Sequence, residues 1–259
     1  MERIVNGVLS GLDDLINESL GLAGTAQYWQ KISALRLRWK PASFDSVALI
    51  RQMLSRTEHN WMEARRVGAI RRAASSENWR WEKKTYISEN NRSKEKTLEK
   101  EIARVSDESW VNQVPTLSGV ISTTAERHCN IDLVHRSADS EFEFIELKVD
   151  SDTAMFAAFE ILKYGVVYVF SRNHASELGY DPAKVLLKAR RIMLCVLAPK
   201  QYYEPFNFDW LERELSRGLR DLGHSNVDMD FRFEHFGEGA MTAREVLQRR
   251  TPLYGLNLE

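Results

Sequence analysis

The stretch Asn130-Ile131-Asp132-Leu133-Val134, followed after a short polar turn by Phe142-Glu143-Phe144-Ile145-Glu146-Leu147-Lys148-Val149, decides the fold that we expect. Both halves are rich in the β-branched, aromatic and other apolar residues of strands, and the turn between them is short enough for a hairpin. Side chains alternate across a strand, so Phe144, Glu146 and Lys148 share one face. On the opposite face Ile145, Leu147 and Val149 are apolar and are expected to pack against a helix. Glu141 and Glu143 precede them on that face and are interpreted as solvent or edge charges.

The register of this hairpin decides whether its charged residues meet. A three-residue loop over 138–140 would pair Ser137 with Glu141, and that register places Asp132 opposite Glu146. Directly opposed Cβ atoms lie about 4.5–5.5 Å apart, so the two carboxylates repel each other unless a cation joins them. Mg²⁺ uses one or two protein carboxylates, so Asp132 and Glu146 could hold this ion together. Lys148 lies two residues after Glu146 on the same face of the strand. The alternative is an ordinary cross-strand ion pair on a half-exposed hairpin.

The remainder of the chain predicts further strands and helices around the hairpin. Helices are expected over 93–105, with Ser93 as the cap, over 153–170 and over 209–222. Further strands are expected over 110–114, 119–124, 192–198 and 229–236, the last at a sheet edge. The run 192–198 is continuously apolar, which indicates burial on both faces. This order predicts an α/β domain over 89–259, with a mixed central sheet flanked by helices.

Residues 1–88 read as a helical N-terminal region. Helices are expected near 5–20, from Pro41 and Ser43 onward, and over 61–74. Segment 51–100 holds 13 Lys and Arg residues against 7 Asp and Glu. Basic residues with interleaved tryptophans suit a nucleic-acid backbone with stacking platforms, and the alternative is a solvated helix face with tryptophans in the core. The candidate nucleic-acid contacts here are Arg65, Arg66, Arg71 and Arg72.

The overall composition narrows the class of protein. The 259 residues are 43% hydrophobic with a formal net charge of −1, so no overall field draws the chain to nucleic acid or to membrane. The two cysteines, Cys129 and Cys195, are interpreted as buried core residues, and no zinc-ligand spacing is present. The N-terminus lacks the pattern of a signal peptide, and no apolar run approaches the roughly 18 residues of a membrane span. A cytoplasmic, soluble protein without a membrane partner is expected.

These motifs together resemble the PD-(D/E)xK superfamily of restriction endonuclease-like nucleases, over roughly residues 93–198. Ile131-Asp132 stands where the family has Pro-Asp, and Glu146-Leu147-Lys148 matches the (D/E)xK element. The family usually adds a Glu from the preceding helix. Glu95, Glu99 and Glu101 compete for that position, and Glu95 is preferred because it lies beside the apolar stripe. Some members carry Gln-x-x-x-Tyr on the next helix, where this chain has Glu160 to Tyr164, with Glu replacing Gln.

The resemblance implies an αβββαβ core and hydrolysis of nucleic-acid phosphodiesters, with DNA as the expected substrate of an endonuclease. Asp132, Glu146 and Glu95 would hold Mg²⁺ (or Mn²⁺), and Lys148 would orient the attacking water. Lys163 and Tyr164 would approach phosphate from the following helix or would be ordinary surface residues. A homodimer is a further expectation, since many relatives act as dimers. The alternative function is an inactive nucleic-acid-binding or protein-interaction module on the same fold.

Overall fold

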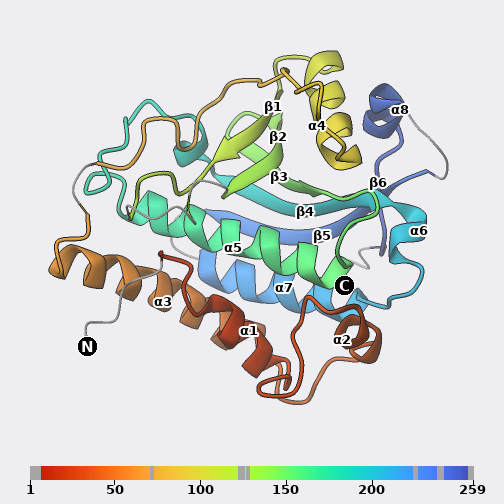
Figure 1. Ribbon diagram of the computed structural model, residues 1–259, viewed down its shortest axis with the longest axis horizontal. Helices are drawn as coiled ribbons and strands as arrows, with labels where there is room; N and C mark the ends of the chain where they lie inside the picture. Colours follow the sequence, from red (N-terminus) through yellow and green to blue (C-terminus); the bar gives the residue numbers. More distant parts are fainter. Residues whose placement is uncertain are drawn as a thin grey trace.

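A six-stranded mixed sheet forms the centre of the molecule (Figure 1). The computed structural model describes residues 7–70, 73–121, 126, 129–223, 227–237 and 242–255. The strands follow one another across the sheet in chain order, with β3–β4 and β4–β5 parallel and the other pairs antiparallel. This arrangement confirms the predicted α/β class with a mixed sheet. The strands are β1 (Trp110–Pro115), β2 (Asn130–Ala138), β3 (Glu141–Leu147), β4 (Arg191–Pro199), β5 (Asp228–Phe236) and β6 (Thr251–Pro252).

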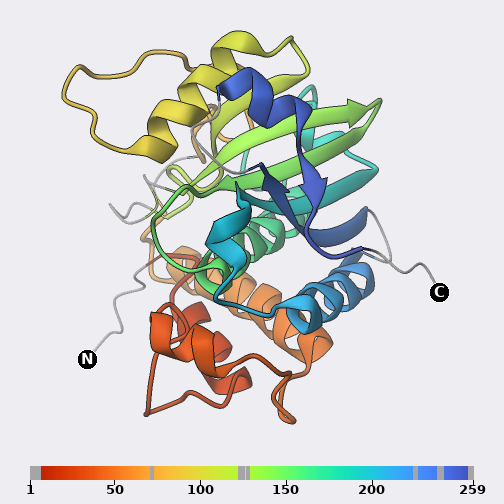
Figure 2. The ribbon, with the colours of Figure 1, turned by 90° about the vertical axis from the view of Figure 1, so that its right-hand side faces the viewer.

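Helices cover both faces of the sheet. One face carries α5 (Ala154–Asn173) and α7 (Asp209–Gly223), with α3 (Ser46–Arg66) and α1 (Leu12–Ser19) packed beyond them as an outer layer (Figure 1). The other face carries α4 (Lys94–Val105) and α8 (Ala243–Gln248), which pack together (Figure 2). Short helices α2 (Lys31–Arg36), α6 (Lys200–Tyr203) and a 3₁₀ turn, η2 (Leu186–Lys188), complete the order. From α4 to β4 the elements run helix, three strands, helix, strand, the order predicted for the core.

The β2–β3 hairpin has the predicted register but a different turn. Leu133 pairs with Ile145 and Val134 with Phe144, and continuing this register by one residue sets Asp132 opposite Glu146. At the turn, Ala138 pairs with Glu141, so the loop has two residues and not three. A bulge between Arg136 and Ala138 absorbs the extra residue and preserves the register toward the strand ends.

Helix α5 is the central helix of the molecule. The Oγ atom of Thr153 accepts a hydrogen bond from the backbone N–H of Phe156 at 3.1 Å and caps its start. Most of its side chains are buried, because the sheet lies on one side and α3 on the other. It is long and apolar enough for a membrane span, yet 83% of its most apolar window is buried inside the protein. That burial is typical of a core helix in a soluble protein.

The N-terminal helices differ from the prediction in their boundaries. Helix α1 begins only at Leu12, after Gly11 with φ of 80°. The two helices expected near 43–54 and 61–74 are one helix, α3, which Asp45 caps through the N–H groups of Val47 and Ala48. It ends at Arg66, followed by Gly68 with φ of 70°. One hydrophobic cluster contains side chains from these helices, from α5 and from the sheet, so the layers share a core.

Two predicted features of the strands are wrong. Residues 119–121 lie in a turn and not in a strand, where Gly119 has φ of 73°, and residues 122–124 of that prediction fall outside the described part of the chain. Strand β5 is not the edge strand, because β6 pairs with its end at Glu234 and His235. A two-residue strand is too short to give a periodic sequence signal.

The outer edge of β5 is covered by hydrogen bonds from its neighbours. The N–H of Phe233 donates to Glu212 on α7 at 2.6 Å, and the carbonyl of Phe233 accepts from Leu253 N–H at 2.9 Å. The carbonyl of Phe231 accepts from Ser216 Oγ at 2.8 Å, and its N–H donates to Asp230 at 2.9 Å. All four backbone groups of the two phenylalanines at this edge are therefore satisfied within the chain.

Candidate functional site

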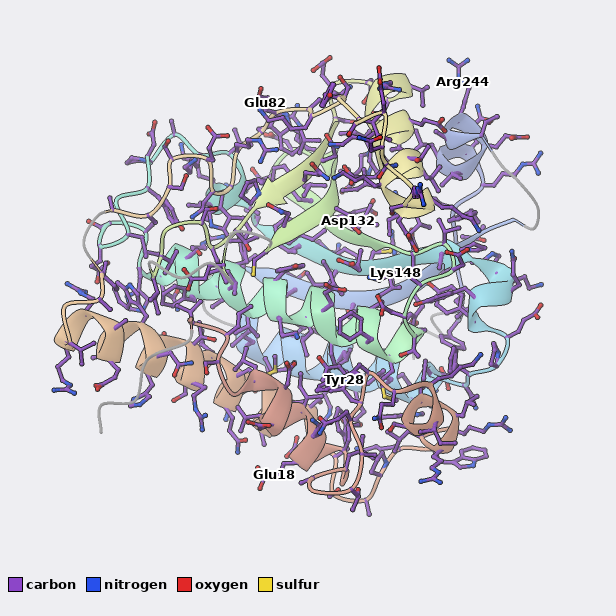
Figure 3. The ribbon with its side chains drawn as sticks, in the orientation of Figure 1. Glu18, Tyr28, Glu82, Asp132, Lys148 and Arg244 are labelled. Carbon is purple, nitrogen blue, oxygen red and sulfur yellow. The ribbon has the colours of Figure 1, made fainter. Side chains whose placement is uncertain are left out.

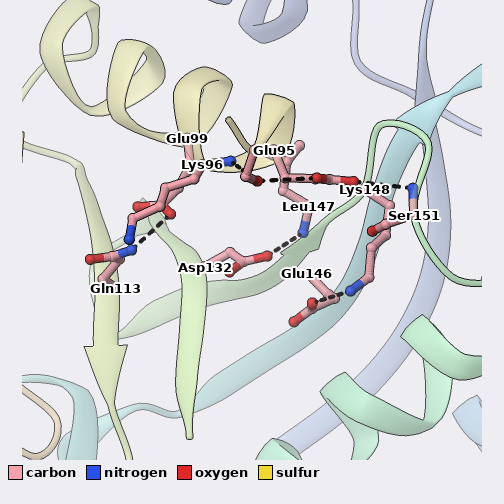
Figure 4. Close-up of a pocket in the computed structure, with 10 residues that line it drawn as sticks. Glu95, Lys96, Glu99, Gln113, Asp132, Glu146, Leu147, Lys148 and Ser151 are labelled. Atoms are coloured by element: carbon pink, nitrogen blue, oxygen red, sulfur yellow. Dashed lines mark hydrogen bonds and ion pairs between the residues drawn. The ribbon is translucent and has the colours of Figure 1, made fainter. Parts of the chain in front are cut away.

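The predicted charged residues line a common pocket at the ends of β2 and β3 (Figure 4). The pocket has a volume of about 250 Å³ and opens between the sheet and the N-terminal half of α4. Figure 4 shows Asp132, Glu146 and Lys148 on the sheet side of this space, with Glu95 and Glu99 descending from α4. The structure therefore brings together the side chains that the hairpin register and the preceding helix predicted. Its lining residues are Ser93, Glu95, Lys96, Glu99, Gln113, Asp132, Glu146, Leu147, Lys148 and Ser151.

Lys148 is held by three carboxylates. Its Nζ atom lies 2.9 Å from Glu146, 3.0 Å from Glu160 and 3.6 Å from Asp152. Its backbone N–H donates to the carbonyl of Leu197 at 3.0 Å, which extends the β3–β4 pairing by one residue and fixes the lysine. Burial alone would lower the pKa of Lys148, but Glu146 and Glu160 outweigh it and raise that pKa. The side chain is therefore an ammonium, aimed at the pocket and nine-tenths buried.

Nearby cations do not fully compensate the carboxyl groups of Asp132 and Glu146. Burial, followed by the carboxylate of Glu99, raises the pKa of Asp132 to about 7, against the N–H of Leu147 that donates to it at 3.0 Å. Burial, followed by Asp132 and Glu160, raises the pKa of Glu146, although Lys148 opposes this. The two carboxyls share one ammonium and repel each other, so the site favours either a proton or a further cation.

Glu95, the preferred upstream acid, is engaged in the loop after β3. Its Oε1 atom accepts the N–H groups of Val149 at 3.2 Å, Asp150 at 3.4 Å and Ser151 at 3.2 Å. Burial would raise its pKa, but these hydrogen bonds lower it to about 2. Glu95 therefore orders the loop that carries Lys148 into α5. Its Oε2 atom accepts a hydrogen bond from Ser93 Oγ at 3.3 Å, and the residue lines the pocket.

Glu99 has a stronger electrostatic effect on Asp132 than Glu95 has. It is the largest charged contributor to the raised pKa of Asp132, and burial raises its own pKa. Its oxygens accept hydrogen bonds from Asn112 and, at 3.2 Å, from Gln113 on β1. The β1–β2 register sets Gln113 across from Asp132, and Gln113 has φ of 46°, which non-glycine residues seldom adopt. The third competitor, Glu101, lines a different pocket.

The residues predicted to contact nucleic acid are dispersed. Arg65 stacks over the ring of Trp61 at 4.7 Å, and Arg66 pairs with Glu63, both at the end of α3. Lys163 bonds Asp13 at 2.9 Å, and Tyr164 is buried with 7% of its surface exposed. Arg71 and Arg72 lie outside the described residues. The tryptophans of this region belong to the core, since Trp61 and Trp79 are 3% and 1% exposed.

A second charged cluster lies on the opposite face of the sheet, where Glu143 was interpreted as a solvent or edge charge. Glu143 is instead 9% exposed and pairs with Arg232 at 2.6 Å, Arg250 at 3.0 Å and His135 at 2.9 Å. Although burial opposes it, these partners lower the pKa of Glu143 to about 2. Glu234 completes the cluster through both arginines. Arg232 and Arg250 lie far along the chain, so the strand pattern alone gave no sign of them.

Sequence reasoning placed Glu160 in a motif but did not predict its contact with Lys148. Asp152 and Lys96 of this site were also missed. The helix cap at Thr153 was the sequence signal that could have predicted this contact. Because α5 begins only a few residues after β3, its first two turns lie near the end of that strand. Of the cysteines, Cys195 is buried as predicted, whereas Cys129 is half-buried, and neither forms a disulfide.

The donor set fits a hard divalent cation held by few protein ligands. Among the described residues, no group of three or more His, Cys, Asp and Glu side chains is arranged to enclose a metal ion. Mg²⁺ commonly takes one or two carboxylates and keeps water molecules in its other positions. Asp132 and Glu146 supply that number, and their raised pKa values show that ionising both is unfavourable, a cost that a bound cation would offset. No family model, no curated protein and no solved structure matches the chain.

Proposed function

We propose that this protein is a Mg²⁺- or Mn²⁺-dependent phosphodiesterase that cleaves nucleic acid, with DNA as the substrate. The observation that carries the proposal is the grouping of Asp132, Glu146 and Lys148 around one open pocket at adjacent strand ends. Two carboxylates for a cation and one ammonium for the developing charge are the elements that phosphodiester hydrolysis needs. The cytoplasm is the proposed compartment.

Charge balance supports a cation at this pocket. Asp132, Glu146, Glu160 and Glu99 place four carboxyl groups in and beside the pocket, and the Lys148 ammonium contacts Glu146 and Glu160. Lys100 lies 3.6 Å from Glu99 and offsets part of the charge of that carboxylate. An excess of carboxyl groups over cations away from bulk water is costly, and structures retain it where a ligand or reaction uses the charge. An ordinary hairpin ion pair would leave no such surplus.

The backbone at Gln113 also supports a functional site. Its positive φ is a strained conformation for a non-glycine residue, and such strain is typical of active sites. The strain directs the Gln113 amide toward Glu99 and sets it across from Asp132. In a relaxed strand Gln113 would point to the face opposite that of its neighbour Asn112, which also bonds Glu99, and so away from Glu99.

In this proposal Asp132 and Glu146 hold the ion, and Glu99 adds negative charge and an oxygen behind them. The bound ion would polarise the phosphate and lower the pKa of a water molecule. Lys148 orients that water and balances the charge that develops on the phosphate. Glu95 and Glu160 act through other groups, since Glu95 fixes the loop after β3 and Glu160 fixes the ammonium. Lys96, exposed at the pocket mouth, would contact the neighbouring phosphate.

A specific contact favours the second candidate function, an inactive binding module. The Lys148 ammonium already lies 2.9 Å from Glu146, so part of the charge that would attract a cation is compensated within the chain. An ion must then displace or share this contact. The two candidates therefore differ in a measurable quantity, the affinity of the pocket for divalent cations.

The deciding experiment is a calorimetric titration of Mg²⁺ and Mn²⁺ into the wild type and into Asp132→Asn, beside a cleavage assay on plasmid and single-stranded DNA. Asp139→Asn, an exposed acid in the β2–β3 turn, is the matched control. We expect binding and cleavage in the wild type and the control, with both lost in Asp132→Asn. Cleavage that persists in Asp132→Asn would remove the assignment. A wild type that neither binds the ions nor cleaves would favour the inactive module.

A further inference from the structure

A short basic and aromatic segment stands on the surface of the N-terminal layer. We call residues 29–40, Trp-Gln-Lys-Ile-Ser-Ala-Leu-Arg-Leu-Arg-Trp-Lys, the α2 segment, because α2 forms its centre. Trp39 is 79% exposed, Ile32 is 52% exposed and Trp29 is 42% exposed. Tryptophan is seldom left this open, since burial of its ring is strongly favourable. Two exposed tryptophans that flank one short helix therefore indicate a ligand-binding surface.

The charge of the α2 segment is entirely positive. Lys31, Arg36, Arg38 and Lys40 are all exposed, and the sequence from Gln27 to Phe44 contains no Asp or Glu. Lys40 pairs with Glu214 at 2.7 Å. None of the other three makes an ion pair with any residue that the structure describes. The segment thus offers three uncompensated cations between two stacking surfaces, although the protein as a whole is nearly neutral.

The α2 segment is connected to the acidic pocket through a row of aromatic rings. Trp29 packs against Tyr28 with ring centroids 5.2 Å apart, and Tyr28 stacks on Phe156 at 6.1 Å. Phe156 lies in the first turn of α5, and Lys148 Nζ lies over its ring at 5.5 Å. Figure 3 shows Tyr28 and Lys148 on the same side of the molecule, separated by the start of α5. Only two side chains, those of Tyr28 and Phe156, therefore lie between Trp29 and Lys148.

We propose that the α2 segment is a binding surface for single-stranded nucleic acid, with bases stacked on Trp29 and Trp39 and phosphates on Lys31, Arg36 and Arg38. The choice of nucleic acid rests on the proposed function of the acidic pocket. Stacking on aromatic side chains between cations is the general mode of single-strand binding, because every base has a stacking face. In the predicted basic region, Trp61 and Trp79 are enclosed in the core and cannot stack a base.

An anionic membrane is the rival ligand for a basic and aromatic surface. A membrane-surface helix needs a continuous apolar face along its length. Helix α2 has six residues, and Ser33 and Ala34 on its inner side are already buried against the protein. The open apolar groups are separate rings and one isoleucine, an arrangement suited to individual bases.

The test is fluorescence anisotropy with a labelled single-stranded DNA of about 15 nucleotides, within the site sizes of such surfaces. Binding is measured in EDTA, so that cleavage plays no part. We expect Trp39→Ala to weaken binding about 10-fold or more. We expect Arg36→Ala/Arg38→Ala to reduce the slope of log K against log salt by about 1.4. The control is Tyr86→Ala/Lys188→Ala, which removes an exposed aromatic ring and a cation elsewhere.

The outcomes separate this inference from the proposed function. Loss of binding in the α2-segment variants with retained binding in the control supports it, even if the wild type shows no metal-dependent cleavage. Equal binding by the wild type and the α2-segment variants would overturn it and leave the nuclease proposal intact. No binding of the oligonucleotide by the wild type would also overturn it. Co-sedimentation with phosphatidylserine vesicles, without DNA binding, would assign the segment to membranes.

Discussion

Lys148 and Glu160 are 12 residues apart in the chain, and the Nζ and Oε2 atoms of their side chains lie 3.0 Å apart. This contact joins the end of β3 to the second turn of α5. It holds the ammonium between Glu160 and Glu146, so the direction of Lys148 depends on a residue that does not itself line the pocket. Positioning of the ammonium can therefore be tested separately from its charge.

Replacement of Glu160 tests this positioning. Glu160→Ala leaves Lys148 charged but removes one of its two close partners, so we expect single-turnover cleavage to slow by about 10- to 100-fold, as displaced catalytic groups do. Glu160→Gln retains an acceptor and should recover part of the rate. The affinity for Mg²⁺, measured by calorimetry, should change less than the rate. An unchanged rate in Glu160→Ala would show that the contact has no role in catalysis.

Removal of Lys148 should separate metal binding from cleavage. Lys148→Ala takes away the ammonium that competes with a cation for Glu146, so we expect tighter Mg²⁺ binding together with loss of cleavage. Glu146→Gln should lose both. Titration calorimetry and a nicking assay on the same preparations measure the two effects. Weaker Mg²⁺ binding in Lys148→Ala would contradict the proposed competition.

The two upstream acids should behave differently. Glu99→Gln removes a charge next to Asp132, and we expect weaker Mg²⁺ binding and a lower pKa for Asp132. Glu95→Gln leaves an acceptor for the loop N–H groups but removes the charge that they stabilise, so we expect a loss of stability, of about 1–2 kcal/mol in urea denaturation. If Glu95→Gln weakens metal binding more than Glu99→Gln does, Glu95 is the upstream ligand after all.

Glu212 should make the stability of the protein depend on pH. Burial raises its pKa from 4.5 to about 7 in the folded protein, while the Phe233 N–H opposes this. Between these values the folded state holds a proton that the unfolded state releases, so its contribution to stability falls as the pH rises from about 4.5 to 7. The shift amounts to about 3 kcal/mol.

Glu212→Gln should remove this dependence and keep an acceptor for Phe233. We expect the urea midpoint of the variant to change less between pH 5 and pH 8 than that of the wild type. Glu204→Gln, an exposed acid after α6, is the control and should leave the pH profile unchanged. Parallel profiles for Glu212→Gln and the wild type would show that the carboxyl is not titrating in this range.

We expect Arg250 to stabilise the packing of the C-terminal elements against the sheet. Its guanidinium pairs with Glu143 at 3.0 Å and with Glu234 at 2.5 Å, and it lies 5.3 Å from the ring of Trp110. Arg250→Ala leaves two buried carboxylates with fewer partners, so we expect a loss of about 3–5 kcal/mol in the free energy of unfolding. Exposed Arg213, paired with Asp209, is the control, and Arg213→Ala should cost under about 1 kcal/mol.

The hairpin and the helices with strong periodicity were predictable because local pattern determines them. The apolar alternation of β3 fixes its register, and Ser93 and Thr153 mark the starts of α4 and α5. The grouping of Asp132, Glu146 and Lys148 followed from that register alone. The reaction remains a prediction that the experiments above address, and the compartment remains a prediction.

Other features depend on contacts that a linear pattern does not contain. The choice between Glu95 and Glu99 depends on where the loop after β3 passes, since its N–H groups bind Glu95. Glu143 was misread because its partners come from β5 and from beyond α8. The sequence left open whether the tryptophans near 61–81 form stacking surfaces or belong to the core, and the space between α3, α5 and the sheet encloses Trp61 and Trp79.

The hydrogen bonds along β5 limit how copies of this protein can associate. Glu212, Ser216, Asp230 and Leu253 use the backbone groups of Phe231 and Phe233 that an intruding strand would require. A homodimer that paired the outer edge of β5 with a second copy would first have to break these hydrogen bonds, as would cross-β growth at this strand. Strand pairing at this edge is thus blocked within the chain, and concentrated solutions should resist fibril formation at β5.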